Sequence, residues 1–265
     1  MPMAAMDQKS TAADTLTIAG TDVARIGLGT NRLRSTPENH EFLRDAVESG
    51  LGLIDTAHVY TNGDSERAIG AGLTPPPDGV VIATKGGARG TGTSGALRKQ
   101  IEQSLESLRI DTIGLYYLHR IDPEIPLEES LGAIAKQRGA GRIKDVGISA
   151  VDVEQIEAAR KVVPIAAVQN QYNLDERGFD EVVDYCEENQ IVFVPYYPLK
   201  GGGSGALSEV AQRHAATEEQ ILLAWLLHRS PAMLPIPGTL SIEHLRENLA
   251  ALDIQLSDED LAALS

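Results

Sequence analysis

Residues 112–119 read Thr112-Ile113-Gly114-Leu115-Tyr116-Tyr117-Leu118-His119, a run of mainly apolar residues that ends on a histidine. A continuous apolar run without a helical period is typical of a strand that is buried on both faces of a parallel sheet. Shorter apolar runs of the same kind come just before Asp55 and Lys85. The stretch therefore predicts a buried parallel strand with a polar side chain at its carboxyl end.

Strand and helix patterns alternate along the chain on both sides of this run. The predicted strands are Gly27–Thr30, Gly52–Asp55, Gly79–Thr84, Thr112–Leu118, Asp145–Ser149, Ala166–Asn170, Ile191–Tyr197 and Met233–Ile236. The main predicted helices are Pro37–Gly50, Ser65–Leu73, Ala96–Leu108, Leu127–Arg138, Asp152–Lys161, Glu176–Asn189, Thr217–His228 and Ser241–Leu252, with a further short helix at Leu207–Ala215. Eight strands alternating with eight main helices predict an α/β fold, a closed (β/α)8 TIM barrel.

Two further features bear on this fold class. Thr15–Ile18 and Val23–Ile26 flank a turn-rich spacer, which predicts a small β-hairpin before the barrel. A doubly wound open sheet is the structural alternative, and it would be supported by Gly-x-Gly-x-x-Gly after the first strand. The segment Gly27–Arg32 contains only the first two of those glycines, so the barrel is favoured.

Length, charge and cysteine content limit the functional classes. The chain has 265 residues, which fits a single barrel domain over residues 15–265 after an expected disordered leader at residues 1–14. A net charge of −15 argues against nucleic acid or an anionic membrane as the main partner. No stretch resembles a membrane span or signal peptide, so a cytoplasmic protein is expected. The single cysteine, Cys186, excludes an internal disulfide and a cysteine-rich metal site; we expect a buried inert thiol and no metal centre.

Four polar residues lie at or just after the ends of three successive predicted strands: Asp55, Tyr60, Lys85 and His119. In a barrel such positions meet on one rim, where these folds place their chemistry. Taken alone, each residue has a structural explanation, as a turn residue, a packing aromatic, a solvated lysine or a core histidine. Their joint appearance favours a catalytic interpretation.

Carbonyl reduction gives each of the four residues a role. Hydride addition to a carbonyl carbon leaves an oxyanion that must be protonated, so the site needs an acid near the oxygen. Tyr60 could be that acid if a cation favours its phenolate, and Lys85 could supply the cation. Asp55 could hold the Lys85 ammonium by a charge-assisted hydrogen bond. His119 could orient the carbonyl oxygen.

The same residues carry a family resemblance. Residues 55–60, Asp-Thr-Ala-His-Val-Tyr, resemble the Asp-Thr-Ala-x-x-Tyr segment of aldo-keto reductases, and residues 83–87 and 111–120 resemble the lysine and histidine strands of that family. The resemblance covers nearly the whole chain after residue 15, and the motifs at 118–123 and 195–199 are similar to the bacterial subgroup that includes pyridoxal reductases. It implies that Asp55, Tyr60, Lys85 and His119 are the catalytic residues, with Tyr60 as the acid.

The resemblance also implies a nicotinamide cofactor, bound in extended form across the rim, and a small-molecule carbonyl substrate. By correspondence, the nicotinamide end involves Gly29, Thr30, Asp55, Ser149, Gln169 and Tyr196. The pyrophosphate is expected near Leu199, Lys200 and Gly201. The adenosine end and its 2′-phosphate are expected near Gly238, Thr239, His244, Glu247 and Asn248.

Three positions depart from the family pattern. Ala150 replaces an asparagine that many members have, and Gly238 and His244 stand where many NADP-preferring members carry lysine and arginine. The subgroup resemblance favours NADP(H) over NAD(H), whereas the lost cations support an alternative, the NAD-dependent oxidation of a sugar or polyol. A second alternative is a non-catalytic, cofactor-binding regulatory subunit, against which the intact catalytic set argues. The resemblance also favours a monomer.

Overall fold

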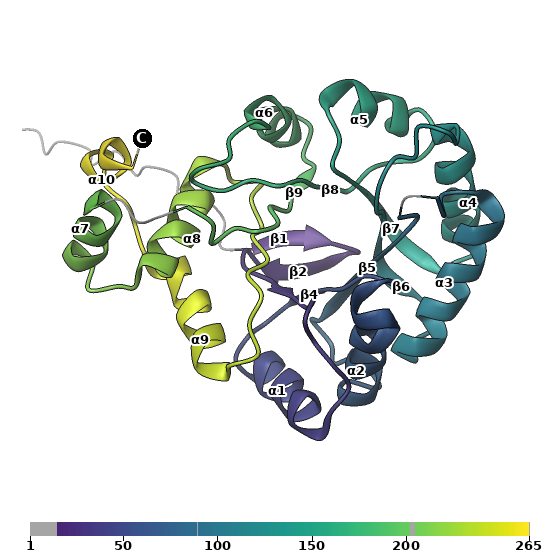
Figure 1. Cartoon of the computed structure of the whole chain (residues 1–265), viewed down its shortest axis with the longest axis horizontal. Helices are drawn as coiled ribbons and strands as arrows, with labels where there is room; N and C mark the ends of the chain where they lie inside the picture. Colours follow the sequence, from purple (N-terminus) through teal and green to yellow (C-terminus); the bar gives the residue numbers. More distant parts are fainter. Residues whose placement is uncertain (1–14, 89, 202–204, 265) are drawn as a thin grey trace, which may run out of the picture.

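The computed structural model describes residues 15–88, 90–201 and 205–264, so the leader expected at residues 1–14 lies outside the described part. Seven parallel strands pair in the order in which they occur along the chain. They are β3 (Leu28–Gly29), β4 (Leu53–Asp55), β5 (Val81–Gly86), β6 (Ile113–Leu118), β7 (Ile143–Ser149), β8 (Ala167–Gln169) and β9 (Val192–Phe193). Figure 1 shows the helices surrounding these strands.

The helices follow the predicted positions closely. They are α1 (Pro37–Glu48), α2 (Asp64–Gly72), α3 (Ser94–Leu108), α4 (Leu127–Gly139), α5 (Val153–Arg160), α6 (Asp180–Glu188), α7 (Gly205–Arg213), α8 (Glu218–Arg229), α9 (Ile242–Ala250) and α10 (Asp258–Ala263), with short 3-10 turns η1 (Tyr60–Gly63) and η2 (Ala251–Asp253). Helix α10 was not predicted, although the sequence contains a capping box for it. The Ser257 side chain accepts a hydrogen bond from the Asp260 backbone N–H, and the Asp260 carboxylate accepts one from the Ser257 backbone N–H.

The predicted eighth strand, Met233–Ile236, is wrong as a regular strand, but the segment still closes the barrel. On one side Phe193 N donates to Ala232 O at 2.8 Å. On the other side Gly27 N donates to Pro235 O at 2.9 Å and Gly29 N donates to Pro237 O at 3.1 Å. Because proline has no N–H, this segment cannot build a complete ladder of its own. The sheet is nevertheless joined from β3 round to β9, and the (β/α)8 prediction is confirmed.

The N-terminal hairpin is present with a shifted second strand. β1 (Thr15–Ile18) pairs antiparallel with β2 (Thr21–Ala24), not with the predicted Val23–Ile26. Ala19 and Gly20 both have positive φ, at 55° and 75°, and form a two-residue turn that starts the second strand at once. Ile18 and Val23 belong to the same buried cluster as barrel residues such as Leu53. The hairpin therefore covers the end of the barrel interior opposite to the carboxyl ends of the strands.

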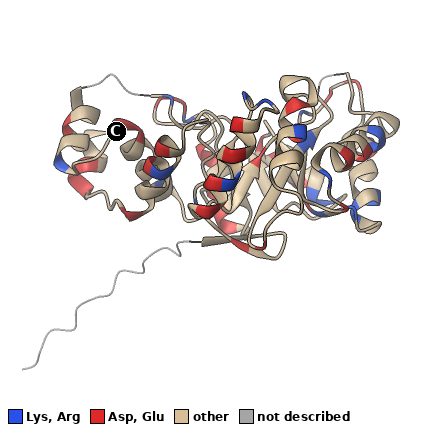
Figure 2. Ribbon diagram, turned by 90° about the horizontal axis from the view of Figure 1, so that it is seen from below, with Lys and Arg blue, Asp and Glu red and all other residues tan. Residues whose placement is uncertain are grey.

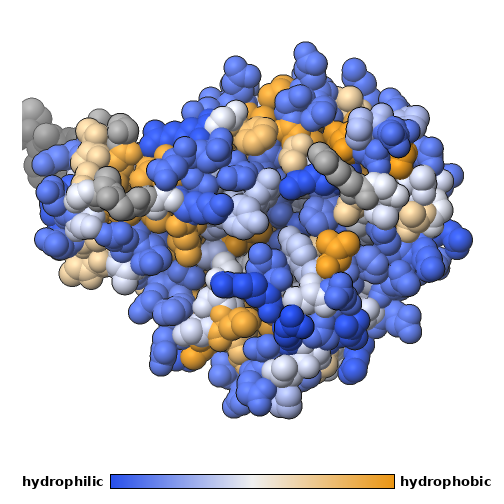
Figure 3. Space-filling view, in the orientation of Figure 1, coloured by the Kyte–Doolittle hydropathy of each residue, from blue (hydrophilic) through white to orange (hydrophobic). Residues whose placement is uncertain are grey.

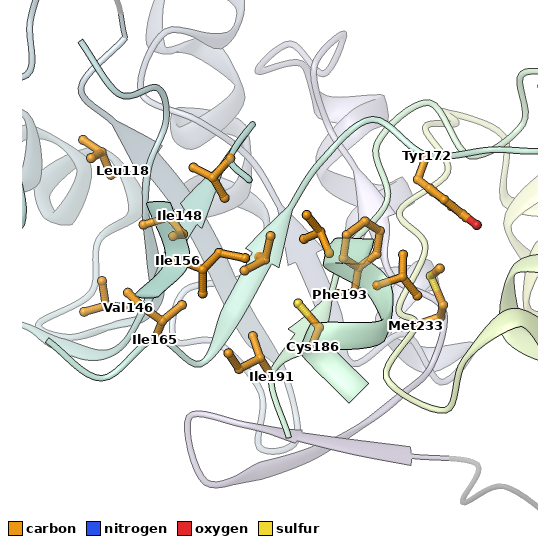
Figure 4. Close-up of a cluster of buried hydrophobic side chains, with 14 of the residues drawn as sticks. Leu118, Val146, Ile148, Ile156, Ile165, Tyr172, Cys186, Ile191, Phe193 and Met233 are labelled. Atoms are coloured by element: carbon orange, nitrogen blue, oxygen red, sulfur yellow. The ribbon is translucent and has the colours of Figure 1, made fainter. Parts of the chain in front are cut away.

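The largest buried cluster lies between the sheet and the helices that cover it. Figure 4 shows part of this cluster, with Leu118, Ile148 and Phe193 from strands facing Ile156 and Cys186 from helices. Burial raises the pKa of Cys186 to about 12 while Arg160 opposes the change, so the thiol stays protonated at neutral pH. The expectation of a buried thiol is confirmed.

The surface of the protein is polar and acidic. The face shown in Figure 3 is mainly hydrophilic with small separated hydrophobic areas, and Figure 2 shows Asp and Glu on many of the outer helices. The chain contains 38 Asp and Glu residues and 23 Lys and Arg residues. Among the described residues, no helix has the length and apolar character that a membrane crossing requires.

Candidate active site

Parallel pairing brings the predicted catalytic residues to one rim of the barrel. Asp55 is the last residue of β4, Lys85 lies one residue before the end of β5, and His119 directly follows β6. The ends of β5 and β6 coincide, because Gly86 is in register with Leu118, whereas Asp55 at the end of β4 is in register with Ala83. Tyr60 opens η1, the short turn after β4.

Lys85 and Asp55 form a buried ion pair at this rim. Lys85 Nζ donates to Asp55 Oδ1 at 2.5 Å and to the backbone oxygen of Thr56 at 2.7 Å, and Gln169 Nε2 donates to Asp55 Oδ2 at 2.9 Å. Lys85 is 0% exposed and Asp55 is 2% exposed. Burial acts to lower the pKa of Lys85, but the charge and hydrogen bond of Asp55, with a further contribution from Tyr60, raise it by more. The structure therefore places a fixed positive charge within the barrel.

Tyr60 lies beside that charge and beside His119. Lys85 Nζ is 5.0 Å from the centre of the Tyr60 ring, and the Tyr60 and His119 rings meet edge to face with their centres 6.1 Å apart. Burial raises the pKa of Tyr60, and the Lys85 charge opposes that rise without cancelling it. Lys85 acts on the pKa of Tyr60 in the expected direction, towards phenolate, but burial has the larger effect in the free protein. Tyr60 therefore rests as a phenol that can donate its proton.

His119 is held neutral. Burial, together with the charges of Lys85 and Arg120, lowers the pKa of His119 to about 3. Its Nδ1 atom is buried, and among the described residues it has no hydrogen-bond partner. A neutral imidazole can donate or accept a hydrogen bond at a substrate oxygen, but it does not supply a proton near pH 7.

A cavity of about 720 Å³ opens at this rim. Most residues predicted to bind cofactor or to act in catalysis line it: Gly29, Thr30, Asp55, Tyr60, His119, Ser149, Gln169, Tyr196, Leu199, Lys200 and Gly238. Lys85 lies behind Asp55, fully buried. The volume lies in the range of ligand and cofactor sites.

The remaining predicted residues are not among those that line the cavity. Gly201, with φ of 105°, is the last described residue before the gap at 202–204. Thr239 Oγ1 accepts from the backbone of Ser241, which caps α9, and this helix carries His244, Glu247 and Asn248. Asn248 is 5% exposed. The residues predicted for the adenosine end are thus placed just before α9 and along it, after Gly238 in the chain.

Sequence reasoning did not assign several residues that line the cavity. Arg120 directly follows His119, and Arg32 follows β3; the others are Asn31, Gln171, Tyr197, Pro198, Ile236 and Pro237. Arg32 Nη2 donates to the Gly238 backbone oxygen at 3.3 Å. Both arginines stand inside motifs quoted from the sequence, but the motif alone does not tell which way a side chain after a strand points.

The residues of this cavity fit a dinucleotide. A Cβ atom at Gly29 would lie 2.8 Å from the Ile236 backbone oxygen, so only glycine lets these two backbone segments of the cavity wall approach so closely. Arg32, Arg120 and Lys200 line the cavity, and none of the ion pairs among the described residues includes them. Cations without acidic partners suit the phosphates of such a ligand.

Comparison with known proteins agrees with the fold. The sequence model described as Aldo/keto reductase family matches residues 25–205 and 203–265. The chain is 35% identical to the pyridoxine 4-dehydrogenase of Escherichia coli, over 95% of this chain and 97% of that protein. It is 37% identical to an uncharacterized oxidoreductase of Schizosaccharomyces pombe, over 95% of this chain and 89% of that protein.

A solved structure of an aldo/keto reductase is also similar to this chain in fold. The aldo/keto reductase of Klebsiella pneumoniae in complex with NADP and acetate is 31% identical, with a TM-score of 0.85 over 95% of this chain and 94% of that chain. The barrel fold and these matches assign the chain to a class of barrel oxidoreductases. It belongs to the aldo/keto reductase family.

Proposed function

We propose that the protein reduces an aldehyde or ketone to an alcohol with NADP(H), with Tyr60 as the proton donor. The observation that carries this proposal is the position of the Tyr60 phenol, which lines the cavity between a neutral imidazole and a buried lysine–aspartate pair. A nicotinamide cofactor, when bound, supplies the hydride.

The side chains of this chain account for the proton. Tyr60 donates its phenolic hydrogen to the substrate oxygen as negative charge develops there. The resulting phenolate is stabilised by the Lys85 ammonium, 5.0 Å from the ring centre, and Asp55 keeps that ammonium charged and in place. His119 orients the carbonyl oxygen as a neutral hydrogen-bonding group.

The preference for NADP(H) is part of the proposal. Gly238 and His244 remove two cations, but Arg32 Nη2 lies 3.3 Å from the Gly238 oxygen and puts a guanidinium beside the expected adenosine end. Arg246 does not replace the lost cations, because its Nε donates to Oγ of Ser49, the residue that follows α1, at 3.2 Å. The NADP in the Klebsiella relative supports the same choice.

Arg32→Gln tests the cofactor assignment. If Arg32 contacts the 2′-phosphate, the Kd of NADPH rises about tenfold or more while the Kd of NADH changes less than about threefold. Equal changes for the two cofactors would assign Arg32 to a part of the molecule that both share. Binding is measured by the fluorescence of the reduced nicotinamide.

The activity is tested by following oxidation of NADPH or NADH with a panel of carbonyl compounds, including pyridoxal, which the pyridoxine 4-dehydrogenase relative suggests, and nitrobenzaldehydes. The proposal expects turnover that is faster with NADPH. Tight cofactor binding without turnover of any substrate would contradict it and favour a regulatory, cofactor-binding role. Preference for NAD and a polyol would favour the oxidative alternative.

A further inference from the structure

The cavity carries positive charge although the protein as a whole is acidic, with a net charge of −15. The charged residues among the described ones that line it are Arg32, Arg120, Lys200 and Asp55, and Lys85 neutralises Asp55. The neutral His119 adds no charge. An anionic ligand is therefore repelled by the protein at long range and must be held by these local cations.

Of the three cations that line the cavity among the described residues, Arg120 is the one that stands next to a proposed catalytic residue in the chain. It directly follows His119, and both residues line the cavity with Tyr60. Its Nη1 donates to Ser149 Oγ at 3.3 Å, and its Nη2 donates to the Tyr196 hydroxyl at 3.5 Å. The guanidinium carbon lies 5.7 Å from the centre of the Tyr196 ring.

These contacts orient the guanidinium but leave its charge without an acidic partner. None of the ion pairs formed by the described residues includes Arg120. Both hydrogen bonds are long and go to neutral hydroxyl groups, so most of its five N–H donors remain available. A planar guanidinium matches the two oxygens of a carboxylate or phosphate better than any other side chain does.

The phosphates of the cofactor have other partners. Under the proposed function they lie towards Leu199–Gly201 and Gly238, where Lys200 and Arg32 stand. Ser149 and Tyr196, the neighbours of Arg120, belong instead to the proposed nicotinamide end. Arg120 is thus placed on the side of the cavity where the carbonyl compound reacts.

We infer that Arg120 determines substrate specificity by binding an anionic oxygen group, carboxylate or phosphate, carried by the aldehyde or ketone. This inference rests on the proposed function. It names the substrate class as carbonyl compounds with a negative charge a short distance from the reacting carbon. Neutral aldehydes react at the same site without this contact.

The experiment compares matched substrates in the full-length enzyme with NADPH. Succinic semialdehyde is compared with butanal for a carboxylate, and D-glyceraldehyde 3-phosphate with D-glyceraldehyde for a phosphate. The variants are Arg120→Gln and Arg120→Lys, and Arg98→Gln is the control, an arginine on the exposed face of α3 whose side chain is 62% exposed.

The inference expects the wild type to favour at least one anionic substrate by about tenfold or more in kcat/KM. Arg120→Gln lowers kcat/KM for that substrate about 10- to 100-fold, through KM above all, and changes that of its neutral partner and the Kd of NADPH by less than about threefold. Arg120→Lys keeps the charge but loses the two parallel N–H donors of the guanidinium, so its kcat/KM for the anionic substrate falls between those of the wild type and Arg120→Gln. Arg98→Gln has the same kcat/KM as the wild type. The substrate pair that shows the preference tells whether Arg120 binds a carboxylate or a phosphate.

Other results overturn the inference. Equal losses for anionic and neutral substrates, or a Kd of NADPH raised tenfold in Arg120→Gln and Arg120→Lys, would assign Arg120 to the cofactor. No preference for either anionic substrate in the wild type would remove its basis while the reductase activity stands. No turnover of any of the four substrates by the wild type would instead count against the proposed function itself.

Discussion

Removing the charge of Lys85 while keeping its volume is expected to destabilise the protein strongly. In Lys85→Met, Asp55 keeps only its bond from Gln169, and the Thr56 carbonyl loses the ammonium as donor. Both side chains are at most 2% exposed, so water cannot replace the lost partner without a rearrangement. Breaking a buried pair of this kind costs about 3–5 kcal/mol of unfolding free energy.

The loss is expected to depend on pH. Burial raises the pKa of Asp55, and Lys85 is the largest influence that opposes this rise. Without Lys85 the folded-state pKa rises further above the unfolded value, about 3.9. A carboxyl with a raised folded pKa contributes stability at low pH that is lost as pH rises through that pKa. The variant is therefore less damaged at pH 5 than at pH 8.

Chemical unfolding followed by the fluorescence of Trp225, the single tryptophan, measures both effects. Asp55→Asn in the Lys85→Met background removes the unpaired charge and is expected to restore at least half of the lost free energy. Three results would refute the reasoning: a loss below about 1 kcal/mol, the same loss at both pH values, or a double variant no more stable than Lys85→Met.

Three further changes test other parts of the site. Because the pKa of His119 lies at about 3, kcat/KM should show no imidazole titration between pH 5 and 8, and a step near pH 6.5 that disappears in His119→Asn would contradict this. Ala150 has φ of 56°, which asparagine tolerates better, so Ala150→Asn should raise the unfolding free energy by about 0.5–1 kcal/mol and tighten cofactor binding; a lower melting temperature would count against it. A Cβ atom at Gly86 would lie 2.0 Å from the buried Tyr116 hydroxyl, so Gly86→Ala should cost about 1–3 kcal/mol in unfolding experiments, whereas Gly95→Ala, with open space, should cost far less.

The barrel and the positions of the proposed catalytic side chains could be predicted because both follow from local patterns. Buried parallel strands are continuous apolar runs, and their carboxyl ends meet on one rim, which brought Asp55, Lys85 and His119 together. Pro235 and Pro237 show the limit of this pattern. An apolar segment was expected to form a strand there, but its two prolines have no N–H to donate, so on the side of β3 it closes the barrel by accepting hydrogen bonds from Gly27 and Gly29.

Long side chains and pKa values were beyond sequence reasoning for a different reason. The direction of Arg120 depends on Ser149 and Tyr196, which lie 29 and 76 residues away in the chain. The state of Tyr60 depends on two opposed influences, burial and the Lys85 charge, whose balance requires the folded environment. Sequence reasoning could name the charge but not the depth of burial.

The most direct test of the proposed mechanism is turnover by Tyr60→Phe at saturating NADPH. The substitution removes the phenolic oxygen and keeps the ring beside Lys85 and His119. We expect the Kd of NADPH to change by less than about threefold while kcat falls about 100-fold or more, as expected when a general acid is lost. A kcat within threefold of the wild type would contradict the assignment of Tyr60 as the proton donor.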